Sequence, residues 1–365
     1  MNSNVGASTL NGICPYYTMY PLDFPLTALK RAEKDDWVYD PFCGRGTTNF
    51  AARLRGLNTV GVDSNPVAVA IAAAKLVGPP PNSIVVECEK LLASDSHEVD
   101  VPEGEFWQLC YEEQTLLALC QLRTRLLEDC TSDERVALRA ILLGALHGPQ
   151  SKTKDSYFSN QMPRTYAAKP DYAVKFWKER GFRPRRVDIL AVVRERASRY
   201  YGYHIPQVCG KVIHGDSRNI TIPADGPVRW IVTSPPYYGM RTYVPDQWLR
   251  NWFLGWPPEV VYTADDQLMH SSPALFAHEL SIVWKRLASL CDARARLIIR
   301  FGGIHDRKAH PREIMRDSLR LADSHWRLCT VRSAGCSTAG RRQANQFVRS
   351  LKHPIEEFDF YARLE

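Results

Sequence analysis

The stretch WVYDPFCGRGTT, residues 37–48, decides the fold of this chain. Its first four residues predict a buried strand that ends on an acid, Asp40. Gly44 and Gly46 follow immediately before a helix-like run. Glycines let the backbone turn sharply and approach a ligand closely, and a helix N-terminus adds free amide donors. The stretch therefore predicts a strand, a tight ligand-binding turn and a helix.

Outward from this stretch, short apolar runs alternate with helix-like segments. The runs are WVYD (37–40), NTVGVD (58–63), KVIHGD (211–216), VRWIVTSPP (228–236), ARLIIRFG (295–302), RLCTVRS (327–333) and EEFDFYARL (356–364). Helices are expected at Leu26–Glu33, Gly46–Arg55, Asn65–Leu76, Ala274–Leu290 and Pro311–Ala322. This alternation predicts an α/β sheet wrapped by helices. The last two runs follow each other across a polar segment, which predicts an antiparallel pair that ends the sheet.

Two further acids end predicted strands. Asp63 closes the second run 17 residues after Gly46, where an acid can hold both ribose hydroxyls of an adenosine cofactor. Asp216 ends the third run and could accept a hydrogen bond from an adenine amino group. The glycine turn lacks the GxGxxG run of a dinucleotide fold and the GK[ST] of a phosphate loop. Three strand-ending acids at these spacings therefore favour an adenosine-containing cofactor of another kind.

A second motif, IVTSPPYYGM, carries a strand into Ser234, Pro235, Pro236 and Tyr237. Consecutive prolines restrict the backbone, remove two amide donors and leave carbonyl oxygens as acceptors. Such a loop suits a substrate group that donates hydrogen bonds.

DPFCGRGTT resembles the DPFxGxGTT cofactor motif of S-adenosylmethionine-dependent, amino-nitrogen DNA methyltransferases. The segment YYTMYPLDFPLTALKRA just upstream is similar to the motif that precedes the cofactor motif in that family. The resemblance implies that Thr18, Met19, Tyr20 and Phe24 lie beside the methionine end of the cofactor. The resemblance implies a Rossmann-like methyltransferase sheet with a helical insertion, and S-adenosylmethionine as cofactor. The cofactor-binding residues it implies are Thr18, Met19, Tyr20, Asp40, Phe42, Cys43, Gly44, Gly46, Thr47, Thr48, Asp63, Ser64, Asp216 and Ser217. Cys43 is expected to be a small buried residue with no chemical role.

In the same family a Ser/Asp/Asn-Pro-Pro-aromatic loop marks methylation of an amino nitrogen. The lone pair of that nitrogen in cytosine or adenine is delocalised into the ring, so the nitrogen is a poor nucleophile. If the Ser234 hydroxyl and the Pro235 carbonyl hold its two N–H bonds, its lone pair can face the methyl donor for direct in-line transfer. Tyr237 would stack on the base after it is flipped out of the duplex.

The serine form of the loop resembles cytosine-N4 enzymes most closely, whereas aspartate is commoner in adenine-N6 enzymes. The motif order points the other way, because a cofactor motif that precedes the catalytic loop is more usual for adenine enzymes. We weight the serine more heavily because it sits at the reacting atom. A cytosine-C5 enzyme would need a nucleophilic cysteine, ordinarily in a Pro-Cys pair, and the chain has no such dipeptide.

Residues 91–206 are expected to form a helical insertion that reads the DNA sequence, between catalytic segments 1–90 and 207–365. Residues 151–204 contain 13 Lys and Arg against 5 Asp and Glu, which accounts for the whole net charge of +7. Basic residues interleaved with aromatic ones suit a nucleic-acid surface. The candidates for DNA contact are Lys152, Lys154, Arg164, Lys169, Lys175, Lys178, Arg183, Arg185 and Arg186, with Arg241, Tyr243, Arg341 and Arg342 outside the insertion. Trp248 and Trp252, spaced i, i+4, are instead expected in the core.

Composition restricts the class of protein further. The ten cysteines include no CxxC pair, which argues against a zinc ribbon and a disulfide framework, and no metal site is expected. No window approaches 18 uninterrupted apolar residues, so no membrane span is expected, and the start resembles no secretory signal. We expect a cytoplasmic protein.

The sequence thus predicts a cytosine-N4 methyltransferase that acts on double-stranded DNA and could have a cognate restriction endonuclease. Its oligomeric state is open. Three alternatives remain: adenine-N6 methylation by the same loop, methylation of RNA or of a protein amide, and a non-catalytic DNA-binding protein that kept the fold. The last alternative predicts damaged motifs, yet Asp40, Asp63, Asp216 and the Ser-Pro-Pro-Tyr loop are all present.

Overall fold

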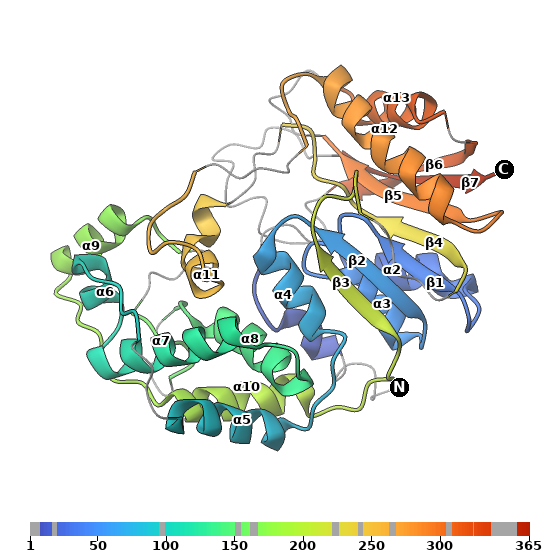
Figure 1. The fold of residues 1–365 in the computed structure, drawn as a ribbon. Helices are drawn as coiled ribbons and strands as arrows, with labels where there is room; N and C mark the ends of the chain where they lie inside the picture. The colour runs from blue at the N-terminus through green and yellow to red at the C-terminus, as the bar shows by residue number, and fades with distance from the viewer. Residues whose placement is uncertain are drawn as a thin grey trace. The chain divides into compact units, whose positions relative to one another are not determined.

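The computed structural model contains a sheet unit and a helical unit (Figure 1). It describes residues 8–16, 20–94, 99–149, 155–160, 167–220, 226–239, 244–262, 268–303, 309–323, 325–336 and 356–365. The sheet unit comprises residues 17–76, 206–242 and 265–365, and the helical unit comprises residues 1–16, 77–205 and 243–264.

A seven-stranded sheet forms the core of the sheet unit. Its strands are β1 (Trp37–Asp40), β2 (Asn58–Asp63), β3 (Gly210–His214), β4 (Val228–Thr233), β5 (Arg296–Gly302), β6 (Trp326–Cys336) and β7 (Glu356–Leu364). They lie in the order β3-β2-β1-β4-β5-β7-β6, and β7 is antiparallel to both of its neighbours. The other strand pairs are parallel. The predicted mostly parallel sheet with an antiparallel C-terminal strand is confirmed.

Alternate residues of the strands face two different layers, as the pleat of a strand requires. Tyr39, Ile231 and Leu297 face a core that includes α12 (Pro273–Leu290) and α13 (Pro311–Leu321). Val38, Val232 and Ile298 face a core that includes α2 (Asp23–Ala28) and α3 (Thr47–Leu54). Helix α4 (Pro66–Ala74) contacts β2 and β3. The central strands are therefore buried on both faces, which explains their continuous apolar sequences.

Four of the five helices predicted for this unit lie within a few residues of their expected bounds. Local signals explain two of the starts: the side chain of Asn65 caps α4 at Val67 N, 2.9 Å, and Ser272 caps α12 at Leu275 N, 3.1 Å. The predicted helix over Leu26–Glu33 is wrong in its bounds. Helix α2 begins at Asp23, and a 3-10 turn, η2 (Leu29–Arg31), ends the segment, because the chain becomes extended at Ala32.

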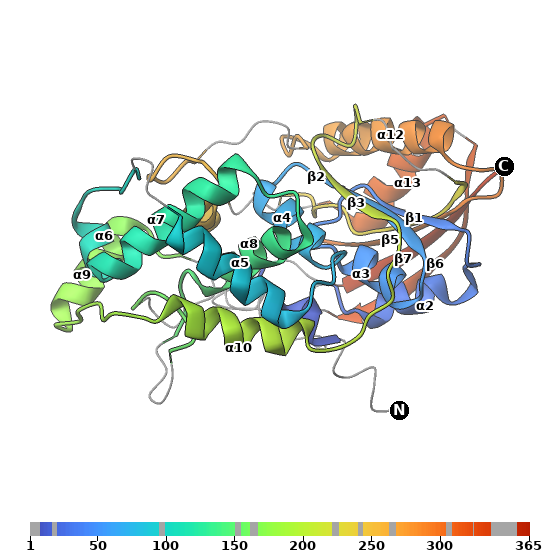
Figure 2. The ribbon, with the colours of Figure 1, turned by 60° about the horizontal axis from the view of Figure 1, so that its bottom comes forward.

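The helical unit is built from α5 (Pro81–Ala93), α6 (Glu105–Cys110), α7 (Glu113–Glu128), α8 (Asp133–Ala145), α9 (Pro170–Glu179), α10 (Ile189–Tyr201) and α11 (Trp248–Phe253), with the 3-10 turns η1 (Ser8–Gly12) and η3 (Pro245–Gln247). Helix α5 packs against α10, α8 and α7, and these helices run side by side in Figure 2. Helix α6 packs against α9.

Tryptophan rings fill the centre of the helical unit. The rings of Trp107 and Trp252 lie 4.5 Å apart, and Phe106 contacts Trp177 and Trp248. Trp248 and Trp252 are each 2% exposed, so the predicted core role of both is confirmed.

The unit boundaries differ from the predicted domains. The helical unit begins at residue 77, since α5 packs on other helices of that unit, and it also takes residues 1–16 and 243–264. Helix α11 belongs to it because its tryptophans pack on Phe106 and Trp107. In the described part of the chain, no helix has the length and apolar character needed to cross a membrane.

Candidate active site

The strand order places the predicted motifs at one edge of the sheet. Strands β1, β2, β3 and β4 are parallel neighbours, so their carboxyl ends share an edge. Asp40 and Asp63 end β1 and β2, and Ser234 directly follows β4. The order reverses between β1 and β4, and open α/β sheets bind ligands at such a switch point, beyond the carboxyl ends of the strands. The two sequence motifs therefore flank the position where a ligand is expected.

The glycine turn after β1 uses its two glycines differently. Gly46 has a φ of 73°, and a Cβ added to it would lie 2.7 Å from the Cβ of Ala72 in α4. Gly44 has a φ of 49°, but an added Cβ would meet nothing within 4 Å. Gly46 is thus required for packing between the turn and α4, whereas the space beside Gly44 is open to a ligand.

Asp63 is half-buried and holds the glycine turn from the side of β2. Its Oδ2 accepts a hydrogen bond from Gly44 N, 2.8 Å, and its Oδ1 accepts one from Asn65 N, 2.9 Å. Burial raises the pKa of this carboxyl, while the two amide donors lower it. A carboxylate has about four acceptor positions. Two therefore remain for hydroxyl donors such as those of a ribose.

Asp40 is fully buried and joins the glycine turn to β4, the strand before the Ser-Pro-Pro-Tyr loop. Its Oδ1 accepts hydrogen bonds from Thr233 Oγ1, 2.6 Å, and Phe42 N, 3.1 Å, and its Oδ2 accepts one from Tyr20 Oη, 3.0 Å. Burial raises the pKa of Asp40 to about 6, although these hydrogen bonds lower it. With no exposed surface, Asp40 acts as a structural support beneath the site.

Thr48 closes the same hydrogen-bond network. Its Oγ1 donates to Val232 O, 3.0 Å, and lies 2.6 Å from Tyr20 Oη. The upstream motif, the glycine turn and the strand before the catalytic loop are therefore one bonded unit. We refer to Tyr20, Asp40, Thr48 and Thr233 as the buried network.

The Ser-Pro-Pro-Tyr loop, predicted to be catalytic, follows this network directly after Thr233. Pro235 is buried, while Ser234, Pro236 and Tyr237 are partly exposed. The Tyr237 hydroxyl donates to Glu357 Oε1, 2.9 Å, and its ring meets Phe301 edge-on at 5.4 Å. Burial, followed by the charge of Glu357, raises the pKa of Tyr237, so its hydroxyl keeps its proton. The ring and the hydroxyl of Tyr237 are both held in place.

The loop after β3 is tied to the glycine turn as well. Ser217 Oγ donates to Pro41 O. Asp216 accepts from Arg218 N, 2.9 Å, and from the Arg218 guanidinium, which also pairs with Glu279 of α12. The carboxylate predicted to receive an adenine amino group is therefore oriented by Arg218.

The remaining predicted cofactor residues lie around the turn. Phe42 meets Trp284 edge-on at 6.2 Å, and Phe24 and Thr47 are buried at 7% and 3% exposure. Ser64 O lies 3.0 Å from His214 Nε2. The Cys43 thiol is 3% exposed and burial raises its pKa, as expected of an inert residue. Thr18 and Met19 lie outside the described residues.

The predicted DNA contacts that can be described belong to the helical unit, and acids already engage several of them. Lys175 pairs with Glu179, Lys178 with Glu105, and Arg185 with Asp155. Lys169 lies over the ring of Tyr262, at 5.0 Å. Arg183 and Arg186 are exposed and have no ion pair among the described residues. Lys152, Lys154, Arg164, Arg241, Tyr243, Arg341 and Arg342 lie outside the described residues.

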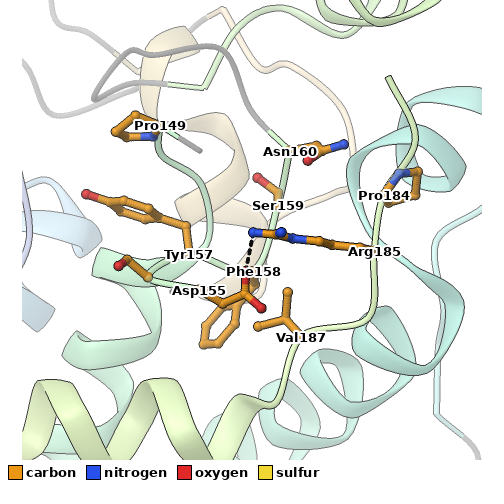
Figure 3. A pocket seen from close by; sticks show the side chains of 10 residues that line it. Pro149, Asp155, Tyr157, Phe158, Ser159, Asn160, Pro184, Arg185 and Val187 are labelled. Carbon is orange, nitrogen blue, oxygen red and sulfur yellow. Dashed lines mark hydrogen bonds and ion pairs between the residues drawn. The ribbon is translucent and has the colours of Figure 1, made fainter. Parts of the chain in front are cut away.

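A small hollow of about 20 Å³ near Arg185 in the helical unit has no catalytic character. Asp155, Tyr157 and Arg185 are among its lining residues, and the Arg185–Asp155 ion pair spans it (Figure 3). Its volume suits a single water molecule. None of the predicted catalytic or cofactor residues lines it.

Comparison with known proteins finds one family model that matches the first part of the chain. Residues 4–74 match the N6_N4_Mtase family model, DNA methylase. This segment contains the upstream motif, the glycine turn and Asp63. No curated protein matches the chain.

Solved structures of methyltransferases are similar to the chain at low identity. An rRNA methyltransferase from Streptomyces viridochromogenes is 13% identical, with a TM-score of 0.38 over 100% of this chain and 93% of that one. An rRNA methylase from Streptococcus thermophilus is 8% identical, with a TM-score of 0.35 over 96% and 100%. A SAM-dependent methyltransferase from Methanosarcina mazei is 10% identical, with a TM-score of 0.37 over 95% and 99%. The DNA methylase match, not these low scores, is what supports methyl transfer.

Several residues of the site escaped the sequence analysis. Thr233 precedes the Ser-Pro-Pro-Tyr loop and carries no motif signal of its own, yet it bonds to Asp40. Arg218 is only two residues from Asp216, whereas Glu279 and Glu357 come from distant segments and meet Arg218 and Tyr237 only in the folded sheet unit. In the described part of the chain, no group of three His, Cys, Asp or Glu side chains could hold a metal ion.

Proposed function

We propose that the chain transfers a methyl group from S-adenosylmethionine to an exocyclic amino nitrogen in double-stranded DNA, namely cytosine N4. The observation that carries this proposal is the buried network. It joins the glycine turn to the strand before the Ser-Pro-Pro-Tyr loop through the 2.6 Å Thr233–Asp40 bond. Because the glycine turn would bind the cofactor and the Ser-Pro-Pro-Tyr loop would bind the target base, a rigid connection between them provides the positioning that direct transfer requires.

The residues at the edge of the sheet fit the proposed cofactor. The open space beside Gly44 allows close approach, and Asp63 keeps two acceptor positions for ribose hydroxyls. Asp216 provides an oriented carboxylate for an adenine amino group. When bound, S-adenosylmethionine supplies an electrophilic methyl group on its sulfonium.

The catalytic loop then orients the nucleophile. Pro235 and Pro236 have no amide N–H, so the loop presents acceptors to an amino group. The Ser234 hydroxyl and the Pro235 carbonyl accept the two N–H bonds, and the nitrogen lone pair is directed at the methyl group. Tyr237, whose ring is fixed by Phe301 and Glu357, stacks on the flipped base.

DNA binding by the helical unit is part of the proposal. Arg183 and Arg186 are the best-supported contacts, because they are exposed and no acid neutralises them among the described residues. Lys175, Lys178 and Arg185 would have to exchange an ion pair for a phosphate. The setting we propose is cytoplasmic DNA modification alongside a cognate restriction endonuclease.

The first test is a labelled-methyl assay with the full chain on duplex DNA, RNA and protein. We expect incorporation into duplex DNA, and mass spectrometry of the digested nucleosides should give N4-methylcytosine. Label confined to RNA or protein would contradict the proposal. Calorimetry measures whether the chain binds S-adenosylmethionine. A non-catalytic DNA-binding protein would not bind it, whereas a methyltransferase would.

Adenine N6 is the second candidate acceptor. The motif order favours it, since the glycine turn precedes the catalytic loop by almost 190 residues. The same digestion would then yield N6-methyladenine. Sequencing with modification detection of DNA from cells that express the chain would identify the base and its recognition sequence together.

A further inference from the structure

Glu357 contacts the catalytic loop although it lies far from that loop in the sequence. It lies 120 residues after Tyr237, whose hydroxyl donates to its Oε1 at 2.9 Å. Because β7 is antiparallel to β5, its first residues lie at the edge where the parallel strands end, and Glu357 pairs with Gly302, the last residue of β5. The one antiparallel strand beside β5 thus brings a carboxylate to the carboxyl edge.

Gly302 makes room for this contact. A Cβ added to it would lie 3.0 Å from Tyr237 Cε2, 3.1 Å from Glu357 Cγ and 3.3 Å from Glu356 O. The residue between the tyrosine and the glutamate therefore has no side chain, and the approach of the two groups is built into the sheet.

The hydrogen bonds around Tyr237 share one direction. A tyrosine hydroxyl has one hydrogen, and Tyr237 donates it to Glu357 Oε1, so Tyr237 Oη is the acceptor in its side-chain hydrogen bond with Ser234. A proton can therefore pass from Ser234 to Tyr237 and from Tyr237 to Glu357 without reversal of either bond.

The other charged groups near this path are paired or turned elsewhere. The charge of Arg300 in β5 interacts electrostatically with Tyr237 and Glu357, but its guanidinium donates two hydrogen bonds of 2.8 Å to Asp359. Glu356 accepts from Ser333 Oγ of β6, 3.3 Å. His310, which directly precedes α13, and Arg312 of α13 face the ring of Phe358, and Arg332 of β6 faces the ring of Tyr361. Among the described residues, Glu357 is the carboxylate that contacts the catalytic loop.

We propose that Glu357 receives, through Tyr237 and Ser234, the proton that the target amino nitrogen loses during methylation. This inference rests on the proposed function. As the N–C bond forms, the bond between the methyl carbon and the cofactor sulfur breaks and leaves its electron pair on sulfur. One N–H bond also breaks, and its electron pair stays on nitrogen. The proton moves to Ser234 Oγ, the Ser234 proton moves to Tyr237 Oη, and the Tyr237 proton moves to Glu357, which becomes a neutral acid and returns the proton to water.

Glu357 is a positioning residue in this scheme because it acts through Tyr237. Glu357→Gln separates the proton path from simple orientation of the ring, since a carboxamide oxygen accepts the same hydrogen bond but cannot take up the proton. Glu356→Gln is the matched control: it makes the same change one residue away, on a side chain that faces Ser333.

The experiment measures single-turnover methylation of duplex DNA, its solvent deuterium isotope effect and the affinities for DNA and cofactor. We expect Glu357→Gln to slow transfer about 100-fold, the lower end of what general acid–base catalysis contributes, with affinities changed less than about 2-fold. Glu356→Gln should behave as the parent protein. Tyr237→Phe should slow transfer similarly, and the Glu357→Gln, Tyr237→Phe double variant should be no slower than Tyr237→Phe alone.

A readout that does not depend on turnover accompanies it. In protein with ring-¹³C tyrosine, the signal lost in Tyr237→Phe should shift in Glu357→Gln and stay in place in Glu356→Gln. Equal transfer rates in Glu357→Gln and Glu356→Gln would overturn the proton path. No transfer by the parent protein or by either variant would instead overturn the proposed function. If Glu357→Gln fails to fold, Tyr237→Phe with an unchanged rate and isotope effect would still refute the path.

Discussion

The sheet unit holds the polar side chains of its motifs in place through hydrogen bonds, whereas the helical unit exposes the basic side chains proposed for DNA contact. Asp40 is 0% exposed and accepts three hydrogen bonds. Lys175 and Lys178 are exposed, and each reaches a surface acid. A buried bonded carboxylate occupies one geometry, while an exposed lysine samples many. Motif residues therefore carry more functional information than a composition of Lys, Arg and aromatic residues does.

Removal of the Ser234 hydroxyl should cause the largest loss of activity, and it tests whether the motif residues of the sheet unit carry the reaction. Ser234→Ala deletes one of the two acceptors proposed for the amino group. We expect kcat to fall about 100- to 1,000-fold, as for the loss of one positioned group that stabilises the transition state, with cofactor affinity unchanged. Ser289→Ala, at an exposed serine of α12, is the control. Equal rates for the two variants would remove Ser234 from the reaction.

Alanine substitutions at the two glycines of the turn should have different consequences, mainly for folding at Gly46 and mainly for cofactor binding at Gly44. Gly46→Ala adds a methyl group 2.7 Å from Ala72 at a φ of 73°, and should destabilise folding by about 3 kcal/mol in denaturant titrations. Gly44→Ala fills open space at a φ of 49° and should cost about 1 kcal/mol. Calorimetry should show that Gly44→Ala nevertheless weakens cofactor binding strongly. Normal binding by this variant would mean that no ligand occupies the open space.

Asp40 should make the stability of the sheet unit depend on pH. Its pKa is raised from 3.8 to about 6 in the folded protein. The folded state therefore binds more protons than the unfolded state between these values, and stability falls as pH rises from about 4 to about 6. Relative to Asp40→Asn, the parent should lose on the order of 3 kcal/mol of unfolding free energy across this window. Asp35→Asn, at an exposed residue, should show no such difference in urea titrations at each pH.

The smallest effects are expected in the helical unit. Arg183→Ala and Arg186→Ala should each weaken DNA binding by about 1 kcal/mol and reduce the slope of log K against log salt by about 1. Lys175→Ala should have a smaller effect, because Lys175 already pairs with Glu179. Fluorescence anisotropy at several salt concentrations checks this ranking. An equal loss of DNA affinity in all three variants would show that ion pairing in the free protein does not predict which residues contact DNA.

Local sequence was enough for most of the sheet unit. The strand predictions at 37–40, 58–63 and 356–364 match β1, β2 and β7 because buried strands have continuous apolar or alternating patterns. The helix over Leu26–Glu33 was misplaced: α2 begins at Asp23, and the segment ends in a 3-10 turn before the extended residue Ala32. The helical unit was less predictable at its boundaries, since a shared aromatic core, not a local pattern, recruits α11 to it.

The sequence by itself determined the chemistry on offer: glycines that permit the turn, acids that end strands, and a Ser-Pro-Pro-Tyr loop rich in acceptors. Those are properties of neighbouring residues, so spacing reveals them. Only the tertiary structure decided that Thr233 bonds to Asp40, that Arg218 pairs with Glu279, and that Glu357 reaches Tyr237. The physical reason is that these partners are about 60 to 190 residues apart, so only the packing of strands and helices brings their side chains within hydrogen-bonding distance.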